Sequence, residues 1–233
     1  MFRKFKELFS SENLLDTAFH TTLTMLEFDH KMYQASRVTL RKSDTDQLPF
    51  DIRTTDRKIN KYEREVRRNV LTHLTVAGTQ NLVPGLVLVS IVIDVERIGD
   101  YTKNIAGLAG MHKQALHGGR YEKTLQEIEN VIEENFGKVV EVLKTQDKPK
   151  ARSVMLVEPD TSAKAESIVA GVMAGKDKSL DTSNAVALAL YARHLKRINS
   201  HLTNIASAIV NPFPRIGFRE KKKDDKNRNR DDI

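Results

Sequence analysis

Two carboxylates near the middle of the chain, Glu96 and Asp100, are the side chains whose spacing suggests chemistry most directly. They are four positions apart, so on a helix both project from the same face. They follow the apolar run 86–93, on a segment that helix packing would bury. Buried carboxylates need a cation or protons to offset their charge, and hard cations with oxygen ligands suit them. The alternative is a solvated face on which Arg97 and Lys103 relieve the repulsion.

A second set of polar side chains precedes this pair. Asp56, Asn60 and Glu63 are spaced so that they share one face of a helix. If the two helices pack side by side, oxygen ligands from both could share a metal centre, as carboxylates do in metal-binding helical bundles. The spacing allows such a centre but does not require it.

Other kinds of catalytic chemistry lack their residues. The chain has no Cys, which excludes disulfides, thiolate metal sites and thiol nucleophiles. Neither a nucleophile elbow nor a phosphate-cradling Gly loop is present. A catalytic di-metal site of the bundle type needs His three residues after Glu, but Gly99 follows Glu96 and Val66 follows Glu63 at that distance. We therefore expect no enzymatic activity.

The elements that must position these side chains are helices. Gly and Pro contribute only 11 and 6 of the 233 residues, which indicates few turns. Apolar residues recur at spacings of three and four, and no alternating strand pattern is present. The sequence therefore predicts an all-α protein with two tandem three-helix bundles, made of six long antiparallel helices. The predicted helices cover about 11–43, 52–76, 84–109, 125–143, 149–174 and 179–210.

An internal repeat supports the division into two bundles. At an offset of one hundred residues the third and sixth predicted helices share six identities. We expect a first repeat at 1–113, a second and degenerate repeat at 121–212, and a charged, disordered tail at 213–233. The identical pairs are Leu88/Leu188, Arg97/Arg197, Ile98/Ile198, Asn104/Asn204, Ile105/Ile205 and Ala106/Ala206.

The charge distribution argues against nucleic acid as a partner. The formal net charge is +7, but the excess is concentrated in residues 181–233. No aromatic residues alternate with the charges of the tail, as a single-strand binding platform requires. The longest apolar stretch, 82–93, is well short of the roughly 20 residues that span a bilayer. The first 20 residues lack the features of a secretory signal, so we expect a cytoplasmic protein without a membrane span.

Three segments resemble the PhoU family of phosphate-uptake regulators. The run IDVERIGDYTKNIA at 93–106 is similar to the family signature, and RHLKRINSHLTNIA at 193–206 is similar to its second-repeat counterpart. The segment DRKINKYEREV at 56–66 resembles the second helix of the family repeat. The resemblance extends from about Leu14 to Pro212. It implies two three-helix bundles, metal clusters held by paired acidic motifs, and a regulatory role in phosphate transport and signalling.

Matched residue by residue, the first repeat keeps most of the implied metal ligands. Glu96 and Asp100 complete the third-helix motif, and Asp56 matches in the second helix. The partner of Asp56 is Asn60, which is neutral and a weaker ligand. The resemblance implies a metal of the iron, zinc or manganese type at these residues.

The second repeat departs from the implied pattern. Lys196 and Ser200 stand where the acidic pair of the third helix should be, and Asp160 is followed four residues later by Lys164. An ammonium at position 196 would repel a cation. We therefore predict at most one metal centre, in the first repeat.

The basic residues of the second repeat allow a different function. Residues 185–218 contain no Asp or Glu. One hypothesis is that they bind an anion or an acidic partner; the simpler alternative is that Lys196 pairs with a carboxylate of the fourth or fifth helix. The candidate contact residues are Arg193, Lys196, Arg197 and His201.

The resemblance also implies the partners. It suggests a non-enzymatic regulator that contacts the ATPase subunit of a phosphate ABC transporter and a phosphate-sensing histidine kinase. Homodimerisation, and peripheral association with a membrane through those partners, would be compatible with this role. Two alternatives stay open: an accessory protein of another type of phosphate permease, and a helical scaffold that has lost metal binding.

Overall fold

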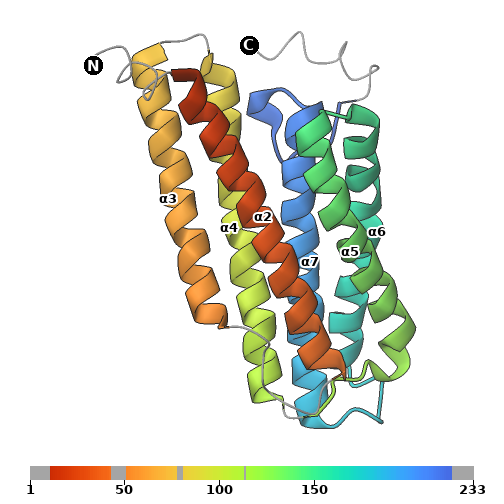
Figure 1. Ribbon diagram of the computed structural model, residues 1–233. Coiled ribbons are helices and arrows are strands. Elements are labelled where there is room, and N and C mark those ends of the chain that lie inside the picture. Colours follow the sequence, from red (N-terminus) through yellow and green to blue (C-terminus); the bar gives the residue numbers. More distant parts are fainter. Residues whose placement is uncertain (1–10, 43–50, 78–80, 113, 222–233) are drawn as a thin grey trace.

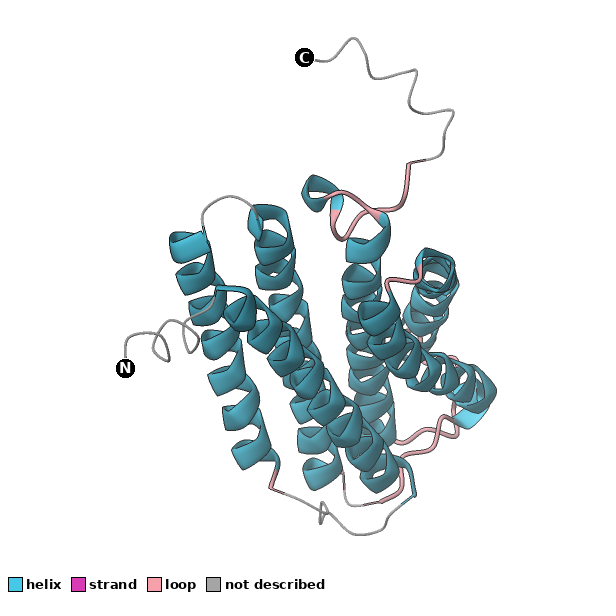
Figure 2. Ribbon diagram, turned by 45° about the horizontal axis from the view of Figure 1, so that its top comes forward, coloured by secondary structure: helices cyan, strands magenta, loops and turns pink. Residues whose placement is uncertain are grey.

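The computed structural model describes residues 11–42, 51–77, 81–112 and 114–221. These residues form six long α-helices and no strand (Figure 2), so the all-α prediction is confirmed. Two short 3-10 turns complete the described elements, at Gly119–Tyr121 and Phe213–Arg215. The helices are α2 (Ser11–Lys42), α3 (Ile52–Ala77), α4 (Leu82–Met111), α5 (Glu122–Thr145), α6 (Lys148–Met173) and α7 (Thr182–Val210).

The helices of the second half begin and end at residues suited to these positions. The Asp147 carboxylate accepts a hydrogen bond from the backbone N–H of Lys150 at 3.0 Å and caps the start of α6. Asp181 caps α7 in the same way through the N–H of Asn184 at 2.7 Å. Such N-caps satisfy backbone donors that have no partner within the helix. Gln146, with φ of 57°, ends α5 in a left-handed conformation, so only two residues separate α5 from α6.

Several helix limits differ from the sequence prediction, and α5 runs from Glu122 to Thr145 rather than over about 125–143. The third helix begins at Leu82, before Pro84, because a proline in the first turn lacks only an N–H that has no helical partner there. The same helix continues through Gly110 to Met111. The sixth begins at Thr182 rather than about 179, because Asp177 holds the preceding residues in a turn through the N–H of Ser179 at 2.9 Å.

The six helices pack as two three-helix bundles placed side by side (Figure 1). Helices α2, α3 and α4 pack against one another, and so do α5, α6 and α7. The two bundles meet where α4 lies against α7 and α2 against α5. This arrangement confirms the predicted fold and places the third helices of the two repeats next to each other.

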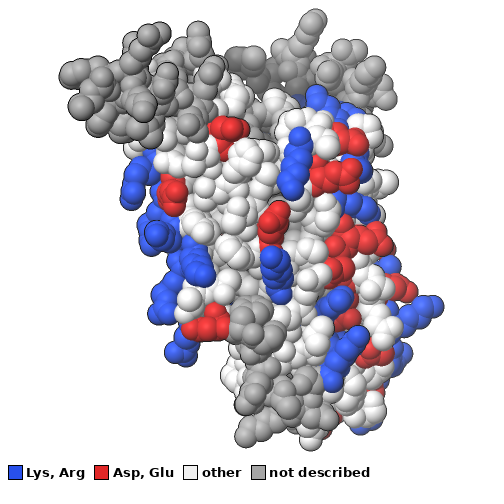
Figure 3. All heavy atoms as spheres, viewed as in Figure 1, with Lys and Arg blue, Asp and Glu red and all other residues white. Residues whose placement is uncertain are grey.

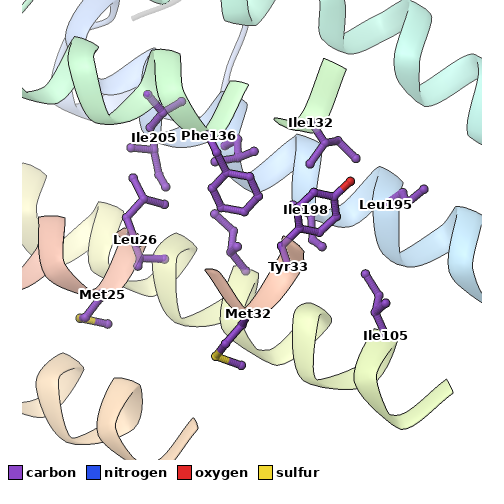
Figure 4. Packing of buried hydrophobic residues seen from close by; sticks show 14 of the residues in the cluster. Met25, Leu26, Met32, Tyr33, Ile105, Ile132, Phe136, Leu195, Ile198 and Ile205 are labelled. Atoms are coloured by element: carbon purple, nitrogen blue, oxygen red, sulfur yellow. The ribbon is translucent and has the colours of Figure 1, made fainter. Parts of the chain in front are cut away.

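One hydrophobic core runs through both bundles. Figure 4 shows Tyr33 of α2 near Phe136 of α5, with Ile198 of α7 close by, and the centroids of the two aromatic rings are 5.4 Å apart. In four of the six identical pairs, both residues are buried in this core. The sequence repeat therefore mainly reflects the similar core packing of α4 and α7. The four pairs are Leu88/Leu188, Ile98/Ile198, Ile105/Ile205 and Ala106/Ala206.

The first part of the predicted disordered tail is instead tied to the second bundle. The side chain of Asn211 donates hydrogen bonds to the carbonyls of Arg215 at 3.0 Å and Phe218 at 2.6 Å. Glu220 accepts two hydrogen bonds from Arg152 of α6, at 2.7 and 2.8 Å. These contacts offset the cost of ordering residues 213–221, and the expectation of disorder is wrong for them. Residues 222–233 lie outside the described residues.

In the part of the chain that the structure describes, no helix has an apolar stretch of the length that a bilayer requires.

Candidate functional site

Helices α3 and α4 bring the predicted carboxylates together. The ammonium of Lys103 on α4 donates to Asp56 Oδ1 of α3 and to Asp100 Oδ1 of α4, both at 2.8 Å. Asn60 lies one turn after Asp56 and its amide is 3.5 Å from that carboxylate. Glu96 lies one turn before Asp100 on the same helix. The face that the i,i+4 spacing predicts is therefore present, and the expected pairing of the two helices occurs.

A further carboxylate, Asp29 of α2, points into the same cluster. Its side chain is fully buried, and neither of its oxygens has a hydrogen-bond partner. Burial raises the pKa of the Asp29 carboxyl well above its usual range. Three neighbouring carboxylates add to this shift through their charge, namely Glu96, Asp100 and Asp56. The cluster thus draws on all three helices of the first bundle.

The sequence analysis did not identify Asp29, although its position carries a signal. Asp29 follows Met25 by four residues and precedes Met32 by three, so it lies on the buried stripe of α2. An acidic residue on such a stripe is unusual, because an unpaired carboxylate is costly to bury.

Gly99 allows Asp29 to approach α4 closely. A Cβ at position 99 would lie 2.8 Å from Asp29 Oδ1 and 3.3 Å from Ile59 Cδ1. The missing side chain therefore makes room for the carboxyl group next to the α4 backbone, between Glu96 and Asp100.

The remaining charges of the cluster are offset by basic side chains of α4. Burial raises the pKa of Glu96, and the charge of Asp100 adds to this effect. Arg97 donates to Asp100 Oδ2 at 3.2 Å and lies 3.6 Å from Glu96 Oε2. Burial lowers the pKa of Lys103, but its hydrogen bonds to the two aspartates outweigh this effect and raise the pKa overall. Arg97 and Lys103 thus give the relief of repulsion that the alternative interpretation expected.

The side chains, as they lie, do not fit a metal ion. Across the described ranges, no group of three or more His, Cys, Asp or Glu side chains is arranged to hold one. The ammonium of Lys103 spans Asp56 and Asp100, the two carboxylates that a bridging cation would link. The metal centre stays a prediction that follows from the family resemblance.

In the second bundle, the lysines at the corresponding positions pair with carboxylates of neighbouring turns and helices. Lys196 of α7 pairs with Glu166 of α6. Lys164 lies 3.0 Å from Asp160 and 2.9 Å from Glu127. The pairing of Lys196 with the fifth predicted helix is the one that the simpler alternative expected.

The four basic candidates of α7 do not share one surface. Arg197 and His201 turn towards α4, away from the α6 partner of Lys196. Arg197 Nε donates to the Tyr101 hydroxyl at 3.2 Å, and its guanidinium lies 5.6 Å from the centre of that ring. His201 Nδ1 is 2.7 Å from Asp94 Oδ1. Arg193 is exposed and lines a shallow depression with Lys196. The structure thus divides the predicted anion surface between two sides of the helix.

A groove of about 900 Å³ lies away from these clusters, between the two bundles. Apolar side chains of α2, α4 and α7 form most of its wall, including Phe19, Val87 and Ile209. Its titratable groups are Asp16 and His73. The groove does not contain any of the predicted site residues.

Comparison with known families matches the chain twice, once per bundle. A model of the PhoU domain matches residues 22–109, from within α2 almost to the end of α4, and residues 125–209, from the first turn of α5 almost to the end of α7. The chain belongs to the PhoU family. PhoU proteins are regulators of phosphate transport, so the resemblance drawn from the signature at 93–106 is confirmed.

Solved PhoU structures share the fold. The crystal structure of PhoU from Pseudomonas aeruginosa superposes with a TM-score of 0.78 at 19% identity, covering 86% of this chain and 97% of that one. A phosphate transport system regulatory protein PhoU from Streptococcus pneumoniae gives a TM-score of 0.75 at 15% identity, covering 86% and 95%. A search of curated proteins gives no match. At these identities the likeness establishes the architecture alone, and the roles of individual PhoU side chains must be argued from this chain.

Proposed function

We propose that this protein is a non-enzymatic regulator of phosphate uptake and phosphate signalling. It acts by binding the ATPase subunit of a phosphate ABC transporter and a phosphate-sensing histidine kinase. The observation that carries the proposal is the match of both three-helix bundles to the PhoU domain. The charged clusters of the two bundles are engaged in ion pairs within the protein, which leaves the outer helix faces for partners.

The outer face of α3 is the contact surface that we propose. This helix buries Ile59, Val66 and Val70 against its own bundle. All of its Lys and Arg side chains are exposed, and Figure 3 shows basic side chains along the edge of the molecule that α3 forms. They are Arg53, Arg57, Lys58, Lys61, Arg64, Arg67 and Arg68.

The charge of this face defines the partner chemistry. The same helix carries only three acidic residues, Asp56, Glu63 and Glu65, and each of them is less exposed than the basic ones. Asp56 is paired with Lys103 and Glu63 with Arg67. The exposed surface is therefore positive, and it suits an acidic surface on the partner protein. The association should accelerate at low ionic strength, because such charges steer the encounter.

Charge reversal tests this surface. The double substitution Arg57→Glu and Lys61→Glu should weaken binding to the ATPase subunit or to the kinase by about tenfold or more, since it places acidic groups opposite an acidic surface. The measurement is the dissociation constant of the purified proteins at low and at physiological salt.

The matched control changes two exposed lysines of the second bundle, Lys176→Glu and Lys178→Glu. This variant has the same net charge as the first and should bind like the unmodified protein. Equal weakening by both variants would show a general effect of charge and would contradict the α3 surface. If neither protein binds the unmodified chain, the proposed partners are wrong.

A further inference from the structure

Lys103 bridges carboxylates of α3 and α4, two helices of the first bundle. Its ammonium is 2.8 Å from Asp56 Oδ1 of α3 and 2.8 Å from Asp100 Oδ1 of α4. The exposed fraction of its side chain is 35%, so the long aliphatic part is largely covered. An ion pair that links two helices in this way has the geometric role of a bridging cation.

A divalent ion cannot easily share this position with the ammonium. Metal–oxygen distances for such ions are about 2.0–2.6 Å. An ion bound to the same two oxygens would lie within about 5 Å of the Lys103 nitrogen, and the two positive charges would repel each other. A metal therefore has to displace the ammonium before it can use Asp56 and Asp100 together.

Asp29 is a second and independent sign that a cation can bind here. Its carboxyl group is fully buried, and both of its oxygens lack a hydrogen-bond partner. It approaches the α4 backbone at Gly99, between the two acidic positions of that helix. While the Lys103 ammonium binds Asp56 and Asp100, the nearby Asp29 carboxyl group has no hydrogen-bond partner.

We propose that Lys103 is the built-in cation of the first bundle, so that the bundle is complete without a metal ion and binds a divalent cation only when this ammonium is removed. Because the carboxylates as they lie do not form a metal site, Asp56 and Asp100 would have to move towards the ion once the ammonium is gone.

The second bundle supports the same principle with different residues. Lys196 pairs with Glu166, and Lys164 pairs with Asp160 and Glu127. The position one hundred residues after Lys103 is Thr203. In each bundle, lysine ammonium groups supply the positive charge that pairs with the carboxylates. The lysines of the two bundles are not at equivalent positions of the repeat.

The test is a titration of the full chain, purified in chelator and dialysed, with Mn²⁺ or Zn²⁺ alone. Lys103→Met keeps much of the aliphatic volume and removes the charge. We expect this variant to bind one ion per chain at least tenfold more tightly than the unmodified protein. Its thermal midpoint should rise when the metal is added, whereas that of the unmodified protein should stay unchanged by metal or by EDTA.

Lys138→Met is the matched control. Lys138 pairs with Glu134 on α5. The exposed fraction of its side chain is 36%, close to the 35% of Lys103. This variant should bind metal no more tightly than the unmodified protein. Adding Asp29→Asn to Lys103→Met should abolish most of the gain, because the buried carboxyl group next to the other acidic residues is lost. Lys103→Gln provides the same comparison if the methionine variant does not fold.

Two results would overturn the proposal. One is stoichiometric metal binding by the unmodified protein with an affinity that Lys103→Met does not increase. The other is the absence of binding by folded variants that lack Lys103. Both readouts concern metal affinity and stability, so they are independent of the proposed phosphate regulation and its partners.

Discussion

At the scale of single residues, Asp29 is a carboxyl group that folding removes from water without giving it a hydrogen-bond partner. Burial first, and then the charges of neighbouring carboxylates, raise its pKa. The group is therefore protonated in the folded chain over a wider pH range than in the unfolded chain. Folding stability must depend on pH through this difference.

Asp29→Asn should flatten that dependence. Below about pH 4, the usual Asp pKa, both states hold the proton. As the pH rises further, the unfolded chain releases the proton first, so stability falls until the pKa of the folded state is passed. Asp29→Asn has no carboxyl group at this position, so its stability should not fall with pH for this reason. At pH 7 the variant should be at least as stable as the unmodified protein. Urea unfolding between pH 4 and pH 8 measures how the free energy of unfolding depends on pH in the unmodified protein and in Asp29→Asn.

The exposed Asp16 offers the control for this experiment. Asp16→Asn should keep the pH slope of the unmodified protein. Parallel profiles for the unmodified protein and Asp29→Asn would contradict the assignment of the buried proton to Asp29.

At the scale of elements, Pro159 is the residue that least suits its helix. It lies inside α6, where it lacks an N–H and leaves the carbonyl of Met155 without its helical donor. Its side chain is exposed, so core packing does not explain its presence. The helix nevertheless continues from Lys148 to Met173 because its other face packs into the second bundle.

Pro159→Ala should therefore stabilise the protein. Restoring the hydrogen bond and the helix propensity should raise the free energy of unfolding by about 1–3 kcal/mol, as measured by chemical denaturation. Pro84→Ala is the contrasting substitution, because Pro84 lies in the first turn of α4 and should change stability much less. Equal effects at both positions would show that the location within the helix does not matter.

At the scale of the whole molecule, polar contacts join the two bundles across their interface. Asp94 of α4 accepts a hydrogen bond from Asn204 of α7 at 2.9 Å. The rings of Tyr101 and His201, which are one hundred residues apart, stack with centroids at 5.7 Å. Equivalent positions of the two repeats thus meet where α4 and α7 pack, with the helices antiparallel.

A second connection between the bundles is a buried ion pair. Arg41 of α2 donates to Glu129 Oε1 of α5 at 3.0 Å, and the Tyr191 hydroxyl of α7 donates to the same oxygen at 2.7 Å. The Arg41 and Glu129 side chains are each 9% exposed. Arg41 also pairs with Glu122. One side chain of the first bundle therefore forms ion pairs with two carboxylates of the second.

Arg41→Met should destabilise the folded protein strongly. Removing one partner leaves the Glu129 charge buried, which costs about 3–5 kcal/mol in the free energy of unfolding. The double variant Arg41→Met with Glu129→Gln should recover part of the loss, since the unpaired charge is gone. A double-mutant cycle measured by urea unfolding checks this coupling, and additive effects would contradict it.

The sequence by itself determined the helices and the bundle plan. Periodic apolar residues record which side of each helix is buried, and the repeat at one hundred residues records that two bundles have equivalent cores. The i,i+4 spacing was sufficient to place Glu96 and Asp100 on one face, because that relation is local to a helix. The signature at 93–106 was sufficient to indicate the PhoU family.

Only the tertiary structure decided which charges meet. Lys103 neutralises Asp56, Asp29 joins the cluster from a third helix, and Lys196 and Arg197 turn to different partners although they are adjacent in sequence. Contacts between helices depend on how the helices are rotated and shifted against one another, and helical periodicity does not specify these quantities. The balance of charge at the carboxylate cluster is therefore a property of packing, whereas the helices that carry it are a property of the sequence pattern.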